Sequence, residues 1–159
     1  MDRRDALRIG GSLALPTTLA GCFTVEQNES THTSDDALDL SEANVVSVDI
    51  DDGDGGTEFT VGLHHDDAGE DGYANWWQVD RLDGTQLGRR DLTHPHDQQP
   101  FERNETINIP DDVTCVVVRG HDQTHGYGGR AVVVNLESGS QTTIQQGADR
   151  QSVSKTDCA

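Results

Sequence analysis

Short segments in which apolar and polar residues alternate are the main pattern along this chain. One stretch shows it most clearly, because Phe59, Val61 and Leu63 fall on one face of an extended backbone. The same alternation places His65 on that apolar face and His64 on the solvent face. Segments of this kind are separated by turn residues, and we predict strands at 45–50, 57–65, 73–82, 85–92, 106–109, 113–119, 130–136 and 141–145.

Turn signals recur at roughly even spacing, and no long stretch repeats apolar residues with a helical period. Asp83-Gly84, between two strand segments, is typical of a two-residue hairpin turn. The adjacent Trp76 and Trp77 must point to opposite faces of their strand, so one belongs to the core and the other to the surface or a site. We therefore predict an all-β fold, an immunoglobulin-like antiparallel β-sandwich of about seven strands. It is expected to span residues 43–146, with a polar C-terminal tail at 147–159.

The N-terminus resembles a haloarchaeal twin-arginine lipoprotein signal. Arg3-Arg4 precedes a run of apolar and small residues, which ends in the lipobox-like Leu19-Ala20-Gly21-Cys22. A transmembrane anchor is the alternative, but the apolar run is too short to span a bilayer. The resemblance implies a signal peptide at 1–21 and lipidation of Cys22, which would hold the protein on the extracellular face of the cell membrane. Residues 22–42 are polar and acidic and are predicted to be a flexible tether.

Charge narrows the classes of function. The chain has 29 Asp and Glu against 11 Lys and Arg, a formal net charge of −18. Such a surface repels the phosphate backbone, so nucleic-acid binding is excluded. Strong self-repulsion with few aromatic residues indicates a salt-loving organism, where ions screen the charge. A disordered acidic chain is the alternative, and the Val-rich alternating segments argue against it.

Histidines gather in three segments that are distant along the chain. In the predicted sandwich, the loops that follow the second, fourth and sixth strands lie at the same end. Six of the seven histidines, all but His32, then become neighbours. The predicted metal ligands are His64, His65, His94, His96, His121, His125 and Asp122, with Asp66 and Asp67 as further carboxylates.

Imidazole nitrogen is a good ligand for zinc and for copper(II). The single Met is Met1, within the signal, so a thioether copper(I) site is excluded. Two alternatives to a metal-binding domain stay open. A network of His, Asp and Tyr can order loops without metal, which would leave an envelope interaction module with an unidentified protein partner. A metal-dependent enzyme would need an open coordination position, and no catalytic residue is assigned.

The sequence also contains residues for a disulfide and for glycosylation, and each modification is one of two alternatives. Cys115 and Cys158 are the cysteines that remain once Cys22 is lipidated, so they either form a disulfide or stay free. The polar tail has no other anchoring signal, which favours the free thiols. Asn28 and Asn104 begin glycosylation sequons that an exported protein could use.

The folded region also resembles a family of small exported proteins of uncharacterised activity. The motifs that carry this resemblance are His94-Pro95-His96, Gln99-Pro100-Phe101 and His125-Gly126-Tyr127-Gly128-Gly129, with further similarity over residues 73–84. The resemblance implies one domain and no particular reaction.

Overall fold

The computed structural model describes residues 37–158, so the predicted signal peptide, Cys22, Asn28 and His32 lie outside the described residues. Among residues 37–158, no helix has the length and apolar character to cross a bilayer. The elements are β1 (Asn44–Gly53), β2 (Gly56–His64), β3 (Ala74–Arg81), β4 (Gln86–Asp91), β5 (Phe101–Ile107), β6 (Cys115–Asp122), β7 (Gly129–Asn135), β8 (Gln141–Gln146) and the 3₁₀ turn η1 (Lys155–Asp157).

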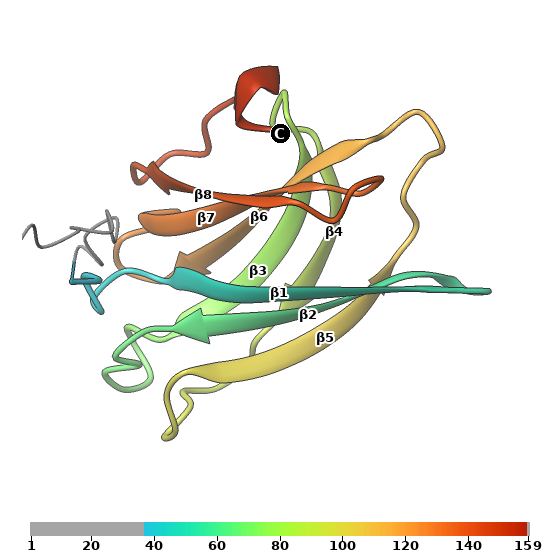
Figure 1. Ribbon diagram of the computed structural model, residues 1–159. Helices are drawn as coiled ribbons and strands as arrows, with labels where there is room; N and C mark the ends of the chain where they lie inside the picture. Colours follow the sequence, from blue (N-terminus) through green and yellow to red (C-terminus); the bar gives the residue numbers. More distant parts are fainter. Residues whose placement is uncertain (1–36, 159) are drawn as a thin grey trace, which may run out of the picture. The chain divides into compact units, whose positions relative to one another are not determined.

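The strands form two sheets that face each other (Figure 1). One sheet has the order β1-β2-β5 and the other β4-β3-β6-β7-β8, with every neighbouring pair antiparallel. An immunoglobulin-like sandwich likewise puts its first, second and fifth strands in one sheet and its third, sixth and seventh in the other. The predicted antiparallel sandwich is confirmed, and within residues 37–158 it has eight strands, because β8 extends the sheet beyond β7.

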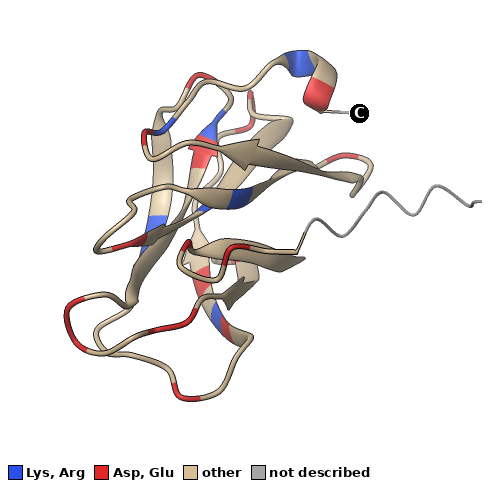
Figure 2. Ribbon diagram, turned by 90° about the vertical axis from the view of Figure 1, so that its left-hand side faces the viewer, with Lys and Arg blue, Asp and Glu red and all other residues tan. Residues whose placement is uncertain are grey.

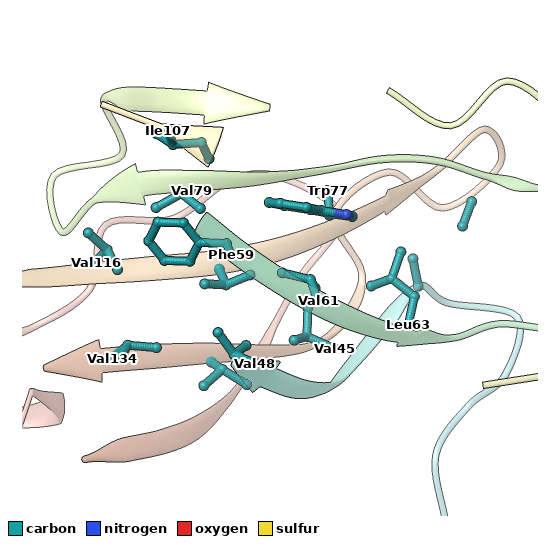
Figure 3. Close-up of a cluster of buried hydrophobic side chains, with 14 of the residues drawn as sticks. Val45, Val48, Phe59, Val61, Leu63, Trp77, Val79, Ile107, Val116 and Val134 are labelled. Carbon is teal, nitrogen blue, oxygen red and sulfur yellow. The ribbon is translucent and has the colours of Figure 1, made fainter. Parts of the chain in front are cut away.

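Side chains from both sheets fill the space between them (Figure 3). The alternation along β2 has the predicted outcome, since Phe59, Val61 and Leu63 are fully buried. His65 follows them inward and is 1% exposed. Of the two tryptophans, Trp77 lies in the core and Trp76 is half-buried on the outer face. Each such large apolar side chain contributes about 1.5–3 kcal/mol on burial, so this core is the main stabilising element.

Gly120 lets the segment before β1 lie close against β6. A Cβ atom at this position would lie 2.5 Å from the carbonyl oxygen of Ala43 and 3.1 Å from Cδ2 of Leu63. Any side chain there would displace the segment that supplies Ser41 to the histidine cluster described below. The glycine is therefore needed for the arrangement of the site as well as for packing.

Most predicted strands differ from the observed ones by one to three residues at an end, and two of the differences affect the site. The strand predicted at 106–109 is β5, which begins at Phe101, within a stretch expected to be a loop. Its buried residues are only the two ends, Phe101 and Ile107, and the polar residues between them conceal the strand pattern. In addition, β6 continues through His121 to Asp122, so the loop predicted at 120–129 is shortened to 123–128.

Acidic residues occur in many of the connecting loops (Figure 2). Asp54, Asp71 and Asp97 are examples, and all three are exposed. This distribution keeps most of the negative charge away from the core, where an unpaired carboxylate is costly. The carboxylates that are buried, described next, each have specific partners.

Candidate functional site

The loops after β2, β4 and β6 meet at one end of the sandwich, as the topology predicts. Asp67, in the first loop, contacts His96 in the second. The end of β6, where the third loop begins, joins them through Asp122, whose Oδ2 lies 3.9 Å from Nε2 of His65. The segment before β1 also takes part, because the carbonyl oxygen of Ser41 lies 3.1 Å from the same Nε2. We call this end of the molecule the histidine pole.

Asp67 is the centre of the histidine pole. Its carboxylate is buried and accepts hydrogen bonds from the backbone N–H groups of Ala74 (3.0 Å) and His96 (2.6 Å). It also contacts the Nδ1 atoms of His65 (2.8 Å) and His96 (3.2 Å). Burial alone would raise the pKa of Asp67, but the hydrogen bond to His65 and the backbone donors lower it below the ordinary value. The backbone of Asp67 is left-handed, with φ of 44°, a conformation that Asp tolerates better than most residues.

His65 uses both ring nitrogens within the protein. Its Nε2 faces the carbonyl oxygen of Ser41, which can only accept, so Nε2 carries a proton. Its Nδ1 faces both the carboxylate and the backbone N–H of Asp67, each at 2.8 Å, and the charge of the ring decides which contact is favourable. Burial opposes the charged ring, but the Asp67 hydrogen bond and the negative charges of Asp122, Asp67 and Asp66 together raise the pKa of His65. The raised pKa favours the protonated ring. Both ring nitrogens are engaged within the protein, so His65 has none available for a metal ion.

His94 and His96 form a different arrangement. Their ring centroids lie 4.9 Å apart, and both residues line the same open pocket. Nδ1 of His94 donates to the carbonyl oxygen of Pro95 (3.0 Å), and Nδ1 of His96 donates to the Asp67 carboxylate. In the neutral rings the lone pair is therefore on Nε2 of both residues. Burial, and then the positive charge of Arg103, lower the pKa of His96, which keeps this ring neutral.

His121 belongs to a separate cluster on the outer face of the five-stranded sheet. Its ring stacks on Trp76 with centroids 3.6 Å apart, and its Nδ1 donates to Oδ1 of Asn75 at 2.7 Å. The guanidinium of Arg89, on β4, lies 4.1 Å from the same Trp76 ring. Because β4 and β6 flank β3 on opposite sides, the two groups cover opposite faces of the tryptophan. Burial lowers the pKa of His121 to about 4, so this ring is neutral at physiological pH.

The remaining predicted ligands are close to the pole but are not gathered around one point. His125 is exposed, with Nδ1 3.5 Å from Oδ1 of Asp122. The same carboxylate oxygen accepts from the backbone N–H groups of Thr124 and His125 and so shapes the loop. His64 is half-buried at the end of β2. Among residues 37–158, no three His, Cys, Asp or Glu side chains form a group that could hold a metal ion.

A buried polar network underlies the outer face of the five-stranded sheet. Nε of Arg119 donates to Oδ2 of Asp80 at 2.9 Å, and both side chains are fully buried. Gln78 donates to the other Asp80 oxygen and accepts from Tyr127 and Arg89. Burial raises the pKa of Asp80 and lowers that of Arg119, so each residue depends on the other to stay charged.

The C-terminal tail covers this network and is fixed by a disulfide. Cys115, at the start of β6, is joined to Cys158. The preference for free thiols was wrong, because the tail has an anchor that its polar sequence conceals. Val153 packs on a small apolar cluster of Val117, Ala131 and Val133 on the outer face of the sheet, and its N–H donates to the carbonyl oxygen of Leu82 at 2.7 Å.

Asn104, the predicted glycosylation site among the described residues, is exposed on β5, and its side chain donates to Glu58. Its glycosylation stays a prediction.

A protein from Halomicrobium mukohataei named "Putative lipoprotein" is 52% identical to this chain over 151 residues. The alignment covers 94% of this chain and 74% of that protein. The chain belongs to the family of that lipoprotein. No model of a known protein family matches the chain, and no solved structure matches it.

In this lipoprotein-family chain, sequence reasoning missed the residues that orient the histidines. Asn75 was overlooked because a lone Asn before two tryptophans carries no pattern of its own. Gln99, whose side chain accepts from the N–H of His65 and donates to the carbonyl oxygen of His96, was noticed only within a motif. Asp67 was a candidate metal ligand, and its role as acceptor from two histidines could not be separated from that of Asp66 without the backbone geometry.

Proposed function

We propose that this protein is a lipid-anchored domain on the extracellular face of the membrane that binds zinc or copper(II) through His94 and His96. The family relative is named a lipoprotein, and the sequence here has its own lipobox ending at Cys22. The Cys115–Cys158 disulfide supports the extracytoplasmic location, because disulfides persist in oxidising compartments.

One observation carries the metal proposal: the two imidazoles present the same tautomer to one pocket. Metal-binding histidines usually donate the second ring N–H to a carboxylate or a backbone carbonyl, which fixes the ring and leaves the other nitrogen to bind. His96 has the carboxylate version of this arrangement through Asp67, and His94 has the carbonyl version through Pro95. His65, by contrast, has no ring nitrogen free.

Two imidazoles leave coordination positions to be filled by water, by a ligand or by a partner. Asp97 and Glu102 also line this pocket, but among residues 37–158 no third side chain completes a metal-holding group with the two histidines. Such a site suits the capture and release of a metal better than permanent retention, because a structural zinc site normally has four protein ligands.

Metal titration of the mature lipidated chain in detergent tests this proposal. We expect isothermal titration with Zn²⁺ and Cu²⁺ to give one site per chain, which is lost in His94→Ala and in His96→Ala. His64→Ala and His125→Ala are matched controls at the same pole and should bind as the wild type does. A wild-type protein that binds neither ion above background, or that binds equally well without both His94 and His96, would refute the site.

The lipid anchor is tested separately. Cys22→Ser should move the protein from the membrane fraction of the host to the medium, because the acyl chains are the expected attachment. Retention of Cys22→Ser in the membrane fraction would contradict lipid anchoring through this residue and would leave the metal proposal untouched.

Both ring nitrogens of His65 are engaged within the protein, which favours a second candidate function, a metal-free interaction module. If His65, Asp67 and Asp122 serve only to order the loops, the histidine pole is a rigid surface for a protein partner. The two candidates differ in one measurement, because the metal-free module keeps the same melting temperature with Zn²⁺ and with a chelator, whereas binding to the folded state raises it.

A further inference from the structure

Four strands form the edges of the two sheets, and one of them differs from the others in charge. The edges are β1 and β5 in the three-stranded sheet and β4 and β8 in the five-stranded sheet. Exposed edges normally carry charged residues, which prevent pairing with other chains. Charges are present on β1 (Asp49, Asp51, Asp52), on β4 (Arg89, Arg90, Asp91) and on β5 (Glu102, Arg103, Glu105).

Strand β8 has the sequence Gln-Thr-Thr-Ile-Gln-Gln, with no charged residue and no proline. It pairs with β7 on one side along its whole length. Within residues 37–158, the backbone of β8 makes no hydrogen bond to any other strand or loop. Its outer side therefore presents free N–H and C=O groups in an extended conformation, which is the template for adding a strand.

The tail does not block this edge. It runs over the outer face of the sheet, where Val153 packs beside Ile144 and Gln151 contacts Arg119. A strand added to the edge of a sheet lies in the plane of the sheet, so face and edge can be occupied together.

From this we propose that β8 is a homodimerisation edge, at which a second copy of the chain adds its own β8 in antiparallel orientation. A net charge of −18 makes two copies repel each other, and β8 is the edge where they can meet without opposing like charges. An antiparallel pair is compatible with two-fold symmetry, so each copy uses the same surface. In a sheet, residues that pair across two strands point to the same face, so the two-fold axis must pass through a pair of identical residues. The middle of β8 lies between Thr143 and Ile144, which places Thr143 at or next to the axis.

The expected dimer is weak and depends on salt. A six-residue edge buries less surface than a standard stable interface. Raising the salt from about 0.1 M to about 1 M shortens the screening length from about 10 Å to about 3 Å and removes most repulsion between the rest of the two molecules. Association should therefore strengthen with salt, opposite to the behaviour of a contact made by ion pairs.

Analytical ultracentrifugation of the full mature chain in detergent, at several concentrations in about 2 M KCl, tests the proposal. The wild type should show concentration-dependent dimers. Thr143→Lys and Thr143→Glu should each raise the dissociation constant about tenfold or more, since like charges then oppose each other across the axis. An equimolar mixture of the two variants should restore dimers. The matched control is Thr106→Lys, at an exposed threonine on edge strand β5 of the three-stranded sheet, and it should dimerise as the wild type does.

Two results would overturn the proposal. One is a wild-type protein that stays monomeric at all concentrations up to about 1 mM, the weak limit for a specific contact. The other is a Thr143→Lys variant that dimerises as strongly as Thr106→Lys, which would place the contact elsewhere. Circular dichroism spectra that match the wild type establish that the variants are folded.

Discussion

Replacing Asp67 by Asn tests how much the carboxylate at the centre of the histidine pole contributes to stability, because the two side chains have nearly the same shape. The carboxylate receives four polar contacts, from the backbone N–H groups of Ala74 and His96 and from the rings of His65 and His96. The Asn side chain has one acceptor oxygen, and its NH₂ group would face donors where the second carboxylate oxygen had been.

At least two buried donors then lose their acceptor, and the His65 ring loses its closest carboxylate. Each unsatisfied buried group costs about 1–3 kcal/mol. With partial relaxation of the loops, we expect Asp67→Asn to lower the free energy of unfolding by about 3 kcal/mol. For a domain of this size such a loss corresponds to a decrease of about 10 °C in melting temperature.

Urea denaturation of wild type and variant at pH 6 gives this difference directly. Asp71→Asn is the matched control, because Asp71 is in the same loop but exposed, and its substitution should change the stability by less than about 0.5 kcal/mol. The reasoning fails if Asp67→Asn is as stable as Asp71→Asn, since the four contacts would then contribute nothing to folding.

Further predictions concern the core network, the disulfide and two histidines. Arg119→Met leaves Asp80 buried without its partner and should cost about 3–5 kcal/mol in denaturant unfolding; a cost below about 1 kcal/mol would mean that Asp80 is neutral in the native protein. Cys115→Ser opens a disulfide that spans 43 residues, and chain entropy predicts a loss of about 4 kcal/mol; an unchanged melting curve would show that the tail is held by its other contacts. The raised pKa of His65 stabilises the fold fully below pH 6.5, and this stabilisation is lost as the pH rises through the folded pKa. His65→Gln should therefore remove a decline in stability on the alkaline side, and an equal decline in the variant would argue against a charged His65. The pKa of His121, lowered to about 4, has the opposite effect, because stability should decrease as the pH falls from 6.5 towards 4; an NMR titration that gives an ordinary pKa for this ring would contradict the buried neutral state.

Much of the fold could be predicted because one face of most strands is apolar. The alternation through Phe59, Val61 and Leu63 is visible in the sequence, and burial of one face leaves a single register. Strand β5 could not be predicted in the same way, because its residues between Phe101 and Ile107 are polar and its pairing with β2 supplies the order.

The site was predictable at the level of topology but not of hydrogen bonding. Loop positions follow from strand order, so the approach of His65 and His96 could be anticipated. Which ring nitrogen is free depends on acceptors such as Asn75 and Ser41, whose positions are set by tertiary packing. The tail was misjudged for a similar reason, since its apolar anchor consists of Val153 and Cys158, which are separated by polar residues.

The tautomers of the histidine rings, read by long-range ¹H–¹⁵N NMR at pH 7 with and without one equivalent of Zn²⁺, test the central claim most directly. Before zinc, His94 and His96 should carry the proton on Nδ1, and His65 should carry a proton on Nε2. Zinc should then shift the Nε2 resonances of His94 and His96 together and leave His65 unchanged. Rings that do not respond to zinc, or a zinc-induced change at His65 in place of His94 and His96, would contradict the account.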